Sequence, residues 1–248
     1  MAQFVDIETA REFMKESLDK ISAEEIHQIC RDLGRKSEIF KLNLSREKIA
    51  TMTVKELSDV MQLIFSIRRR SKKLIEQYNA ANLIQWTKAL LYDESPVSQR
   101  FETFCDHFDG LEINLRYDLA SELLHFSDPE KYWLWTRWVW DPKTKTGALP
   151  LVITEDYELE ATGLGESYLK VGKAMAFIHH VGEAAEFEVM RYGSFGVDTY
   201  LCSVYIVYVY TVLRMRMTQE FNKVMPGLPE FSKRLLGIHK LEERKYAS

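Results

Sequence analysis

Residues 199–213 read Thr-Tyr-Leu-Cys-Ser-Val-Tyr-Ile-Val-Tyr-Val-Tyr-Thr-Val-Leu, a run of fifteen residues without a charge. Its many β-branched and aromatic residues favour a strand by propensity. The run is long for a strand, however, and it continues past Arg214 into helix-forming sequence without a glycine or proline. It therefore predicts one helix over residues 198–224, with Asp198 as its N-cap. Because this helix is apolar on every side, other parts of the protein must enclose it.

The length of the uncharged run also bears on membranes. A membrane-spanning helix needs about 20 apolar residues, and here Asp198 and Arg214 bound a shorter run. We therefore expect the buried core helix of a soluble protein, and not an integral membrane protein.

The composition is typical of a soluble globular protein, with 46% hydrophobic and 28% charged residues. The formal net charge of −4 gives no general attraction to nucleic acid or to anionic membranes. The cysteines Cys30, Cys105 and Cys202 are far apart and lack metal-ligand spacing, so we expect buried thiols in a reducing compartment. The N-terminal residues lack the pattern of a signal peptide, and we predict a cytoplasmic protein.

Helical patterns cover most of the remaining chain. A first helix is expected after Asp6. Two capping boxes, Ser22-Ala-Glu-Glu25 and Thr53-Val-Lys-Glu56, predict the starts of later helices. The first of these two helices is expected to end at Gly34.

These patterns predict a mainly α fold, a multi-helical globular bundle around the buried C-terminal helix at about 198–224. We expect a single helical domain over residues 1–248. The least regular stretch, residues 141–162, is where a seam between an N-terminal and a C-terminal helical part would fall.

Four of the five tryptophans lie within residues 131–140. For about 136–154 a short β-hairpin is an alternative to a helix followed by a loop. Two interpretations of the tryptophans remain open. They can form a stacking platform for a base, sugar or flat cofactor, or they can anchor the core. In the first case the ligand-binding residues are Trp135, Arg137, Trp138 and Asp141.

If the tryptophans instead belong to the core, they are expected to cover the apolar central helix. Four large aromatic side chains carry enough apolar surface to close one flank of such a helix. We then expect residues 133–140 to pack on it near Tyr205, Tyr208 and Val212.

Two Glu-x-x-His pairs have the i, i+3 spacing with which the helices of di-iron bundles present two ligands. They are Glu24/His27 and Glu122/His125, and the metal candidates are Glu122 and His125. The alternative is that His125 caps a helix end and that the other pair lies on the surface. We expect no bound metal and no other cofactor.

Two short fragments resemble the helix-hairpin-helix DNA glycosylases. Gly163-Leu164-Gly165 opens one expected helix, and Val197-Asp198-Thr199 opens a later one. In that family a glycine-rich hairpin holds the DNA backbone, and an aspartate after it serves catalysis. The resemblance implies a DNA-processing enzyme with Asp198 as the catalytic carboxylate. The match covers six residues, and the alternative role of Asp198 is the N-cap described above.

The sequence thus favours a helical binding or accessory protein that acts through protein or small-ligand contacts. No reaction can be assigned, and whether the protein is an enzyme stays open. A protein partner or a homo-oligomer is expected, and nucleic acid is not. The helix-hairpin-helix enzyme is the alternative.

Overall fold

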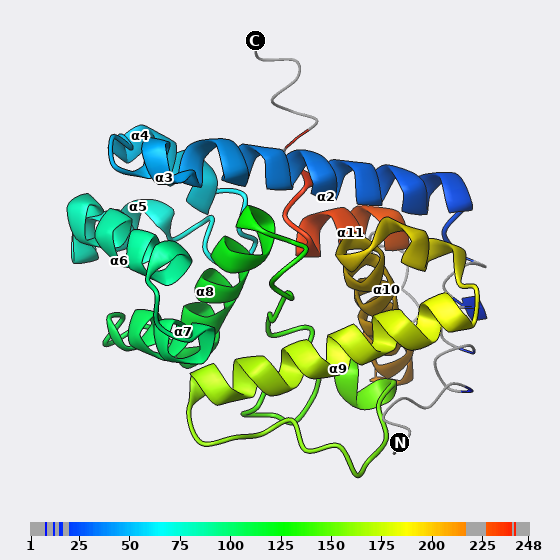
Figure 1. Ribbon diagram of the computed structural model, residues 1–248. Coiled ribbons are helices and arrows are strands. Elements are labelled where there is room, and N and C mark those ends of the chain that lie inside the picture. Colours follow the sequence, from blue (N-terminus) through cyan, green and yellow to red (C-terminus); the bar gives the residue numbers. More distant parts are fainter. Residues whose placement is uncertain are drawn as a thin grey trace. The chain divides into compact units, whose positions relative to one another are not determined.

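The computed structural model describes residues 20–216 and 227–239, together with Glu8, Glu12, Lys15, Glu16 and Leu241. The predicted mainly α bundle is confirmed, since 67% of the chain is helical and the described residues form no strand. The elements (Figure 1) are, in chain order, α2 (Ala23–Leu44), α3 (Arg46–Ile49), α4 (Val54–Met61), α5 (Ser71–Tyr78), α6 (Ala80–Tyr92), α7 (Val97–Asp106), α8 (Ile113–Ser127), η1 (Leu149–Leu151), α9 (Leu164–Ala184), η2 (Glu188–Tyr192), α10 (Ser194–Arg216) and α11 (Leu228–Leu235). The helix expected after Asp6 lies outside the described residues.

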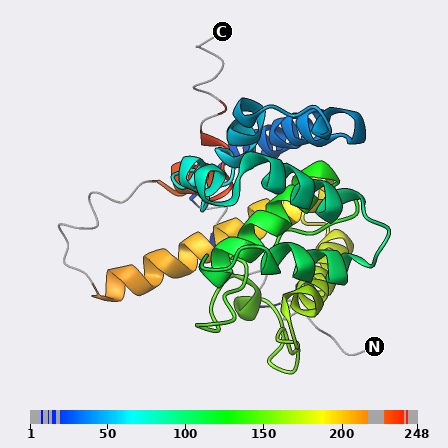
Figure 2. The same ribbon diagram turned by 90° about the vertical axis from the view of Figure 1, so that its left-hand side faces the viewer.

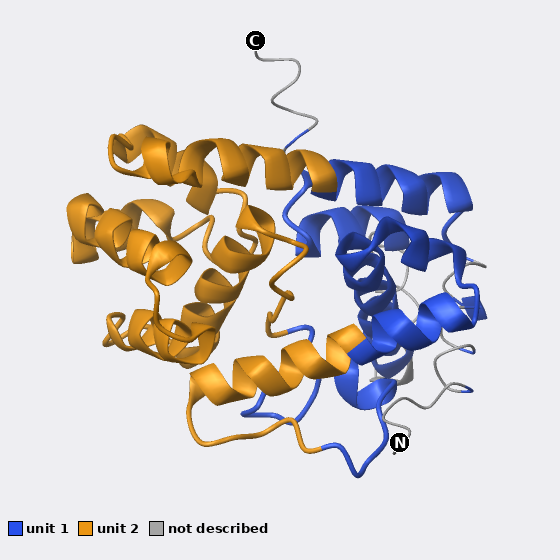
Figure 3. Cartoon of the chain, viewed as in Figure 1, with its two compact units in different colours: residues 1–33, 138–157, 177–248 blue, residues 34–137, 158–176 orange. Residues whose placement is uncertain are grey.

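The chain forms two compact units, each assembled from separate stretches of sequence (Figure 3). Unit 1 consists of residues 1–33, 138–157 and 177–248, and unit 2 of residues 34–137 and 158–176. Helices α2 and α9 each contribute residues to both units. The single domain and its seam at 141–162 therefore stay predictions, although one change of unit, after residue 157, falls within that stretch.

Unit 1 is built around α10, the helix predicted from the uncharged run. The helix begins at Ser194, four residues before the predicted start, and the predicted part after residue 216 lies outside the described residues. Asp198 is consequently an interior residue, and its prediction as the N-cap is wrong. The earlier start follows from Gly193, whose φ of +61° makes the turn out of η2.

Helix α10 packs against η2 and α11. Residues Val197 to Val204 are buried without exception, whereas Tyr208 to Val212 are partly exposed. The end of α10 extends past α11 (Figure 2), next to the stacked rings of Tyr210 and Phe231. By length and composition, residues 194–212 are apolar enough to cross a membrane, and 61% of that window is buried within the protein.

Unit 2 is built around α8, which packs against α6 and α7. Eleven of its residues are buried, on all sides of the helix. They include four polar residues, Asp118, Ser121, Glu122 and His125, which lie three or four positions apart. Such a spacing places them along one stripe of the helix.

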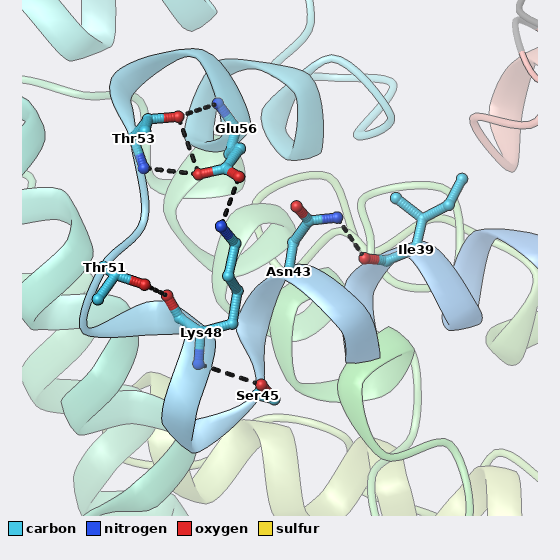
Figure 4. Close-up of polar contacts among 7 residues, drawn as sticks. All are labelled: Ile39, Asn43, Ser45, Lys48, Thr51, Thr53 and Glu56. Carbon is cyan, nitrogen blue, oxygen red and sulfur yellow. Dashed lines mark hydrogen bonds and ion pairs between the residues drawn. The ribbon is translucent and has the colours of Figure 1, made fainter.

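Both predicted capping boxes are present. The hydroxyl of Ser22 accepts from the Glu25 backbone N–H, and the Glu25 carboxylate accepts from the Ser22 N–H. Thr53 and Glu56 make the same reciprocal pair at the start of α4, where Glu56 also binds Lys48 at 2.6 Å (Figure 4). Helix α2 does not end at Gly34 as predicted, but continues to Leu44. Buried residues on both sides of Gly34 hold the helix together and outweigh the low helix propensity of a single glycine.

The tryptophan-rich segment is not a hairpin. Residues 132–136 are neither helix nor strand, and the described part of 136–154 contains one isolated bridge, between Asp141 and Thr146. Gly147 forces the chain to turn there, since its φ is +137° and a Cβ at this position would collide with the Val139 carbonyl. The backbone groups of this segment must therefore find partners outside a sheet.

Candidate functional site

The polar stripe of α8 supplies the partners that a sheet would otherwise give to the segment 132–137. The Trp135 backbone N–H donates to the Ser121 hydroxyl, and the Arg137 N–H donates to the Asp118 carboxylate at 2.9 Å. The Nδ1 atom of His125 lies 2.7 Å from the Tyr132 carbonyl oxygen, which can only accept a hydrogen bond, so Nδ1 is the donor. Buried polar side chains on α8 therefore serve to fix this extended segment.

The two candidate metal ligands are already engaged by protein groups. The Glu122 carboxylate binds the Lys36 ammonium at 2.6 Å, with both side chains buried, and His125 donates to Tyr132 as described. Among the described residues, no group of three or more histidine, cysteine, aspartate or glutamate side chains could hold a metal ion. The expected lack of a metal stays a prediction, and elemental analysis of the purified protein tests it.

Burial raises the pKa of Asp118 to about 8, although the hydrogen bond from Arg137 acts in the opposite direction. The unfolded chain has the ordinary aspartate pKa of about 3.9. Between these values the folded protein keeps a proton that the unfolded chain has lost, so we expect stability to fall as pH rises from about 4 to about 8. Chemical unfolding at several pH values should show this slope, and Asp118→Asn should remove it. An unchanged slope in the variant would assign the pH dependence to other groups.

The four predicted ligand-binding residues are divided between the two units, and a site formed by all four stays a prediction. Trp135 and Arg137 belong to unit 2, whereas Trp138 and Asp141 belong to unit 1. Trp135, Trp138 and Asp141 are buried, and Asp141 caps its own turn by accepting from the Lys143 N–H. Arg137 is exposed, and its backbone serves Asp118.

These contacts agree better with the core interpretation of the tryptophans. One of the predicted contacts with α10 is present. Trp138 lies against Tyr205 of α10, with the ring centroids 6.4 Å apart. Trp135 is instead stacked on Tyr117 of α8, at 4.4 Å and 2° between the ring planes. Its other neighbour is Phe101, which is itself stacked on Tyr168 of α9 at 4.4 Å. Trp135 thus belongs to an aromatic column of unit 2.

The same segment contributes to an open cleft of about 740 Å³ in unit 2. Two other cavities, one in each unit, have volumes of about 290 and 220 Å³. The residues of the large cleft come from the start of α3, the α6–α7 connection, the segment after residue 130 and the first half of α9: Arg46, Tyr92, Asp93, Glu94, Ser95, Val97, Arg100, Lys131, Tyr132, Trp133, Tyr168, Leu169, Gly172, Lys173 and Ala176. Its volume lies within the range of about 300–1,000 Å³ that is usual for small-molecule sites.

Aromatic side chains form much of the cleft wall. Trp133 is half-buried and lies over Gly172 of α9, where a Cβ would be 3.4 Å from the indole. The Trp133 carbonyl accepts from the Tyr168 hydroxyl at 3.0 Å, which ties the segment to α9. Tyr92 is the last residue of α6. Its hydroxyl donates to the Leu44 carbonyl at 2.5 Å. A hydrogen bond therefore holds the Tyr92 side chain and the backbone of Trp133 in place.

Arg100 is the buried cation of the cleft. Its guanidinium donates to the carbonyl oxygens of Leu90 and Ser95 and to the Tyr132 hydroxyl. The two carbonyls belong to the end of α6 and the turn before α7. Arg100 thus holds the α6–α7 connection against the tryptophan-rich segment, and its role is to position the wall of the cleft.

The glycine turn at the start of α9 does not leave room for a phosphate. Gly163 precedes the helix as predicted, with a φ of +90°. The Gly165 N–H donates to the Glu102 carboxylate at 2.5 Å, and a Cβ on Gly163 would lie 2.8 Å from the same oxygen. An internal carboxylate thus occupies the place in which a helix N-terminus would bind an anion.

Asp198, the catalytic candidate of the helix-hairpin-helix alternative, is fully buried in α10. Burial raises the pKa of the Cys30 thiol to about 11, and the negative charge of Asp198 adds to this effect. The same two causes raise the pKa of Cys202. The three cysteines are buried free thiols, as expected, and the raised pKa keeps Cys30 and Cys202 protonated at neutral pH.

Fold and cleft together define an all-helical protein with an open, aromatic and cationic cleft. Comparisons with protein-family models, with curated proteins and with solved structures give no match for this chain. The contacts of the described residues therefore carry the functional assignment.

The sequence predicted ligand-binding residues in and next to the tryptophan-rich segment, which contributes to this cleft. None of the four predicted residues lines the cleft. Lys131, Tyr132 and Trp133 lie in the tryptophan-rich segment, whereas the predicted members Trp135 and Trp138 point into the core. Arg46 and Lys173 carry no local pattern that would single them out. Only tertiary structure brings α3, the α6–α7 connection and α9 to one place.

Proposed function

We propose that this protein is a helical binding protein whose cleft in unit 2 takes a small-molecule ligand. The observation that carries the proposal is the cleft itself, with about 740 Å³ of space beside the aromatic wall of Tyr92, Tyr132 and Trp133. Rigid aromatic surface within a concave site is the usual means of holding a small ligand. The cleft lining contains no histidine or cysteine.

A neutral fluorescent probe tests this proposal. N-phenylnaphthylamine should bind the protein with a defined stoichiometry and gain fluorescence in an apolar site. Trp133→Leu should weaken its binding by about two- to twelvefold, because stacking on an indole contributes about 0.5–1.5 kcal/mol beyond area burial.

The matched control is Trp86→Leu, in the same unit. Trp86 is also half-buried, but it lines the smaller cavity of about 290 Å³ and is stacked on His107 at 4.4 Å. This variant should bind the probe like the wild type, and far-ultraviolet circular dichroism should show equal helix content in both variants. Failure of the wild type to bind the probe, or an equal loss in both variants, would contradict the proposal.

The helix-hairpin-helix enzyme is the alternative, and the contacts weigh against it. Glu102 takes the anion position at Gly165, and Asp198 is buried within α10. Duplex DNA titrated at low salt gives the direct test, because phosphate contacts would make binding strong there and steeply salt-dependent. We propose that no such binding occurs.

We further propose that the protein is soluble and cytoplasmic and has a protein partner or forms a homo-oligomer. The mostly buried window of α10 supports the first part of this proposal. Sedimentation velocity of the purified protein measures its oligomeric state, and cell fractionation tests its location.

A further inference from the structure

We infer that the ligand of the cleft is a small organic anion that combines a planar apolar part with a carboxylate, sulfonate or phosphate group. This inference rests on the binding function proposed above and adds the chemical class of the ligand. The combination of charge and aromatic surface within one cleft carries it.

The first observation is the local balance of charge. The cleft lining has four cationic side chains, Arg46, Arg100, Lys131 and Lys173, and two anionic ones, Asp93 and Glu94. The lining thus has an excess of two positive charges, although the chain as a whole has a net charge of −4. A concave surface with one prevailing sign of charge raises the local concentration of ligands of the opposite sign.

The second observation is how two of these cations are held. The Arg46 guanidinium lies over the Tyr92 ring, 4.7 Å from its centroid, and the Lys131 ammonium lies 5.3 Å from the Tyr132 centroid. Among the described residues, neither cation forms an ion pair with a carboxylate. An aromatic face orients a cation but leaves its full charge in place, whereas a carboxylate would neutralise it.

Three other cations of unit 2 are paired with carboxylates instead. Arg70 binds Glu112 at 3.5 Å, Lys48 binds Glu56 at 2.6 Å, and Lys41 binds Glu38 at 3.4 Å. Arg46 and Lys131 of the cleft thus differ from these three cations in having an aromatic ring as the partner.

The third observation concerns the two carboxylates of the cleft. The Asp93 carboxylate accepts hydrogen bonds from the backbone N–H and the hydroxyl of Ser95, which lower its pKa. It is therefore committed to its own turn. Glu94 is exposed, and its charge opposes anion binding without cancelling the excess. Planar aromatic surface at Trp133 together with these cations matches a ligand that is flat and apolar at one end and anionic at the other.

Two fluorescent probes of the same shape test this inference. Anilinonaphthalene sulfonate carries one negative charge, and N-phenylnaphthylamine lacks it. The sulfonate should bind the wild type about tenfold more tightly, and this ratio should decrease between about 20 and 200 mM salt because the cations are exposed.

Arg46→Gln and Lys131→Gln should each weaken sulfonate binding by about three- to tenfold and leave binding of the neutral probe within about twofold. Lys88→Gln, an exposed lysine of α6 outside the cleft, makes the same change of charge and should alter neither affinity. Glu94→Gln should strengthen sulfonate binding, an effect that damage to the fold does not produce.

The outcomes separate the two proposals. Equal affinity for both probes, with no selective loss in Arg46→Gln and Lys131→Gln, would overturn the anion inference and leave the binding function standing. If neither probe binds the wild type, the proposed function itself is wrong.

Discussion

Replacing Trp135 with alanine is expected to lower the free energy of unfolding by about 3–5 kcal/mol, the usual cost of truncating a buried tryptophan. The side chain is 0% exposed and lies between Tyr117 and Phe101 in the aromatic column. Loss of the indole leaves a cavity and breaks both ring contacts. A typical domain has a total stability of about 5–15 kcal/mol, so the variant is expected to be marginally stable. Thermal and urea unfolding, followed by circular dichroism, measure this loss.

Trp133→Ala is the matched control, because it makes the same substitution two residues away. Trp133 is half-buried and leaves its ring partly in the cleft, so its loss should cost less. If the two variants unfolded at the same urea concentration, Trp135 would not be the core residue described here. Trp135→Phe should restore part of the loss, because it keeps an aromatic ring in the column.

Lys36→Met should be destabilising by about 3–5 kcal/mol, since it removes one partner of a buried ion pair. The Lys36 ammonium lies 2.6 Å from the Glu122 carboxylate and 3.9 Å from the Phe126 centroid, and the lysine is 0% exposed. Without Lys36 the carboxylate of Glu122 remains buried and loses this positive partner. Urea unfolding of the variant measures the loss.

A double-mutant cycle separates a missing partner from missing packing. Lys36→Met combined with Glu122→Met removes both charges and keeps apolar volume, so the double variant should recover most of the stability lost by Lys36→Met. Losses that simply add would indicate that the pair is not coupled. Exposed pairs such as Arg234 with Glu230 should change stability by at most about 1 kcal/mol when broken.

Local signals in the sequence predicted local structure well. Both capping boxes formed, because the reciprocal hydrogen bonds of a box join residues three positions apart. The core helix was found from its uncharged run, but its start was missed because Gly193, and not Asp198, makes the turn. The predicted helix end at Gly34 is wrong because tertiary contacts, which a local pattern does not contain, bury the residues on both sides of it.

The candidate site depends on distant parts of the chain, and the sequence predicted it only in outline. The tryptophan-rich segment contributes Trp133 to the cleft, yet the sequence pattern does not show that Trp135 contacts Tyr117 whereas Trp133 lines the cleft. An extended segment held by helix side chains has no periodicity that marks its two sides. The sequence also does not predict that Ser121 and Asp118 bind the backbone of this segment, because the tertiary structure decides which groups lie next to them.

The division of unit 2 into residues 34–137 and 158–176 has a consequence for synthesis on the ribosome. Tyr168 completes the aromatic column through Phe101, which precedes it by 67 residues. A nascent chain that has emerged only as far as Arg137 therefore lacks one end of the column and the α9 side of the cleft. Domains usually fold as units in the order of their synthesis. Here residues 34–137 need the later residues 158–176 to complete their unit. Translation arrested after residue 137 should therefore yield a chain that proteases digest readily. Arrest well beyond residue 176 should yield a resistant chain.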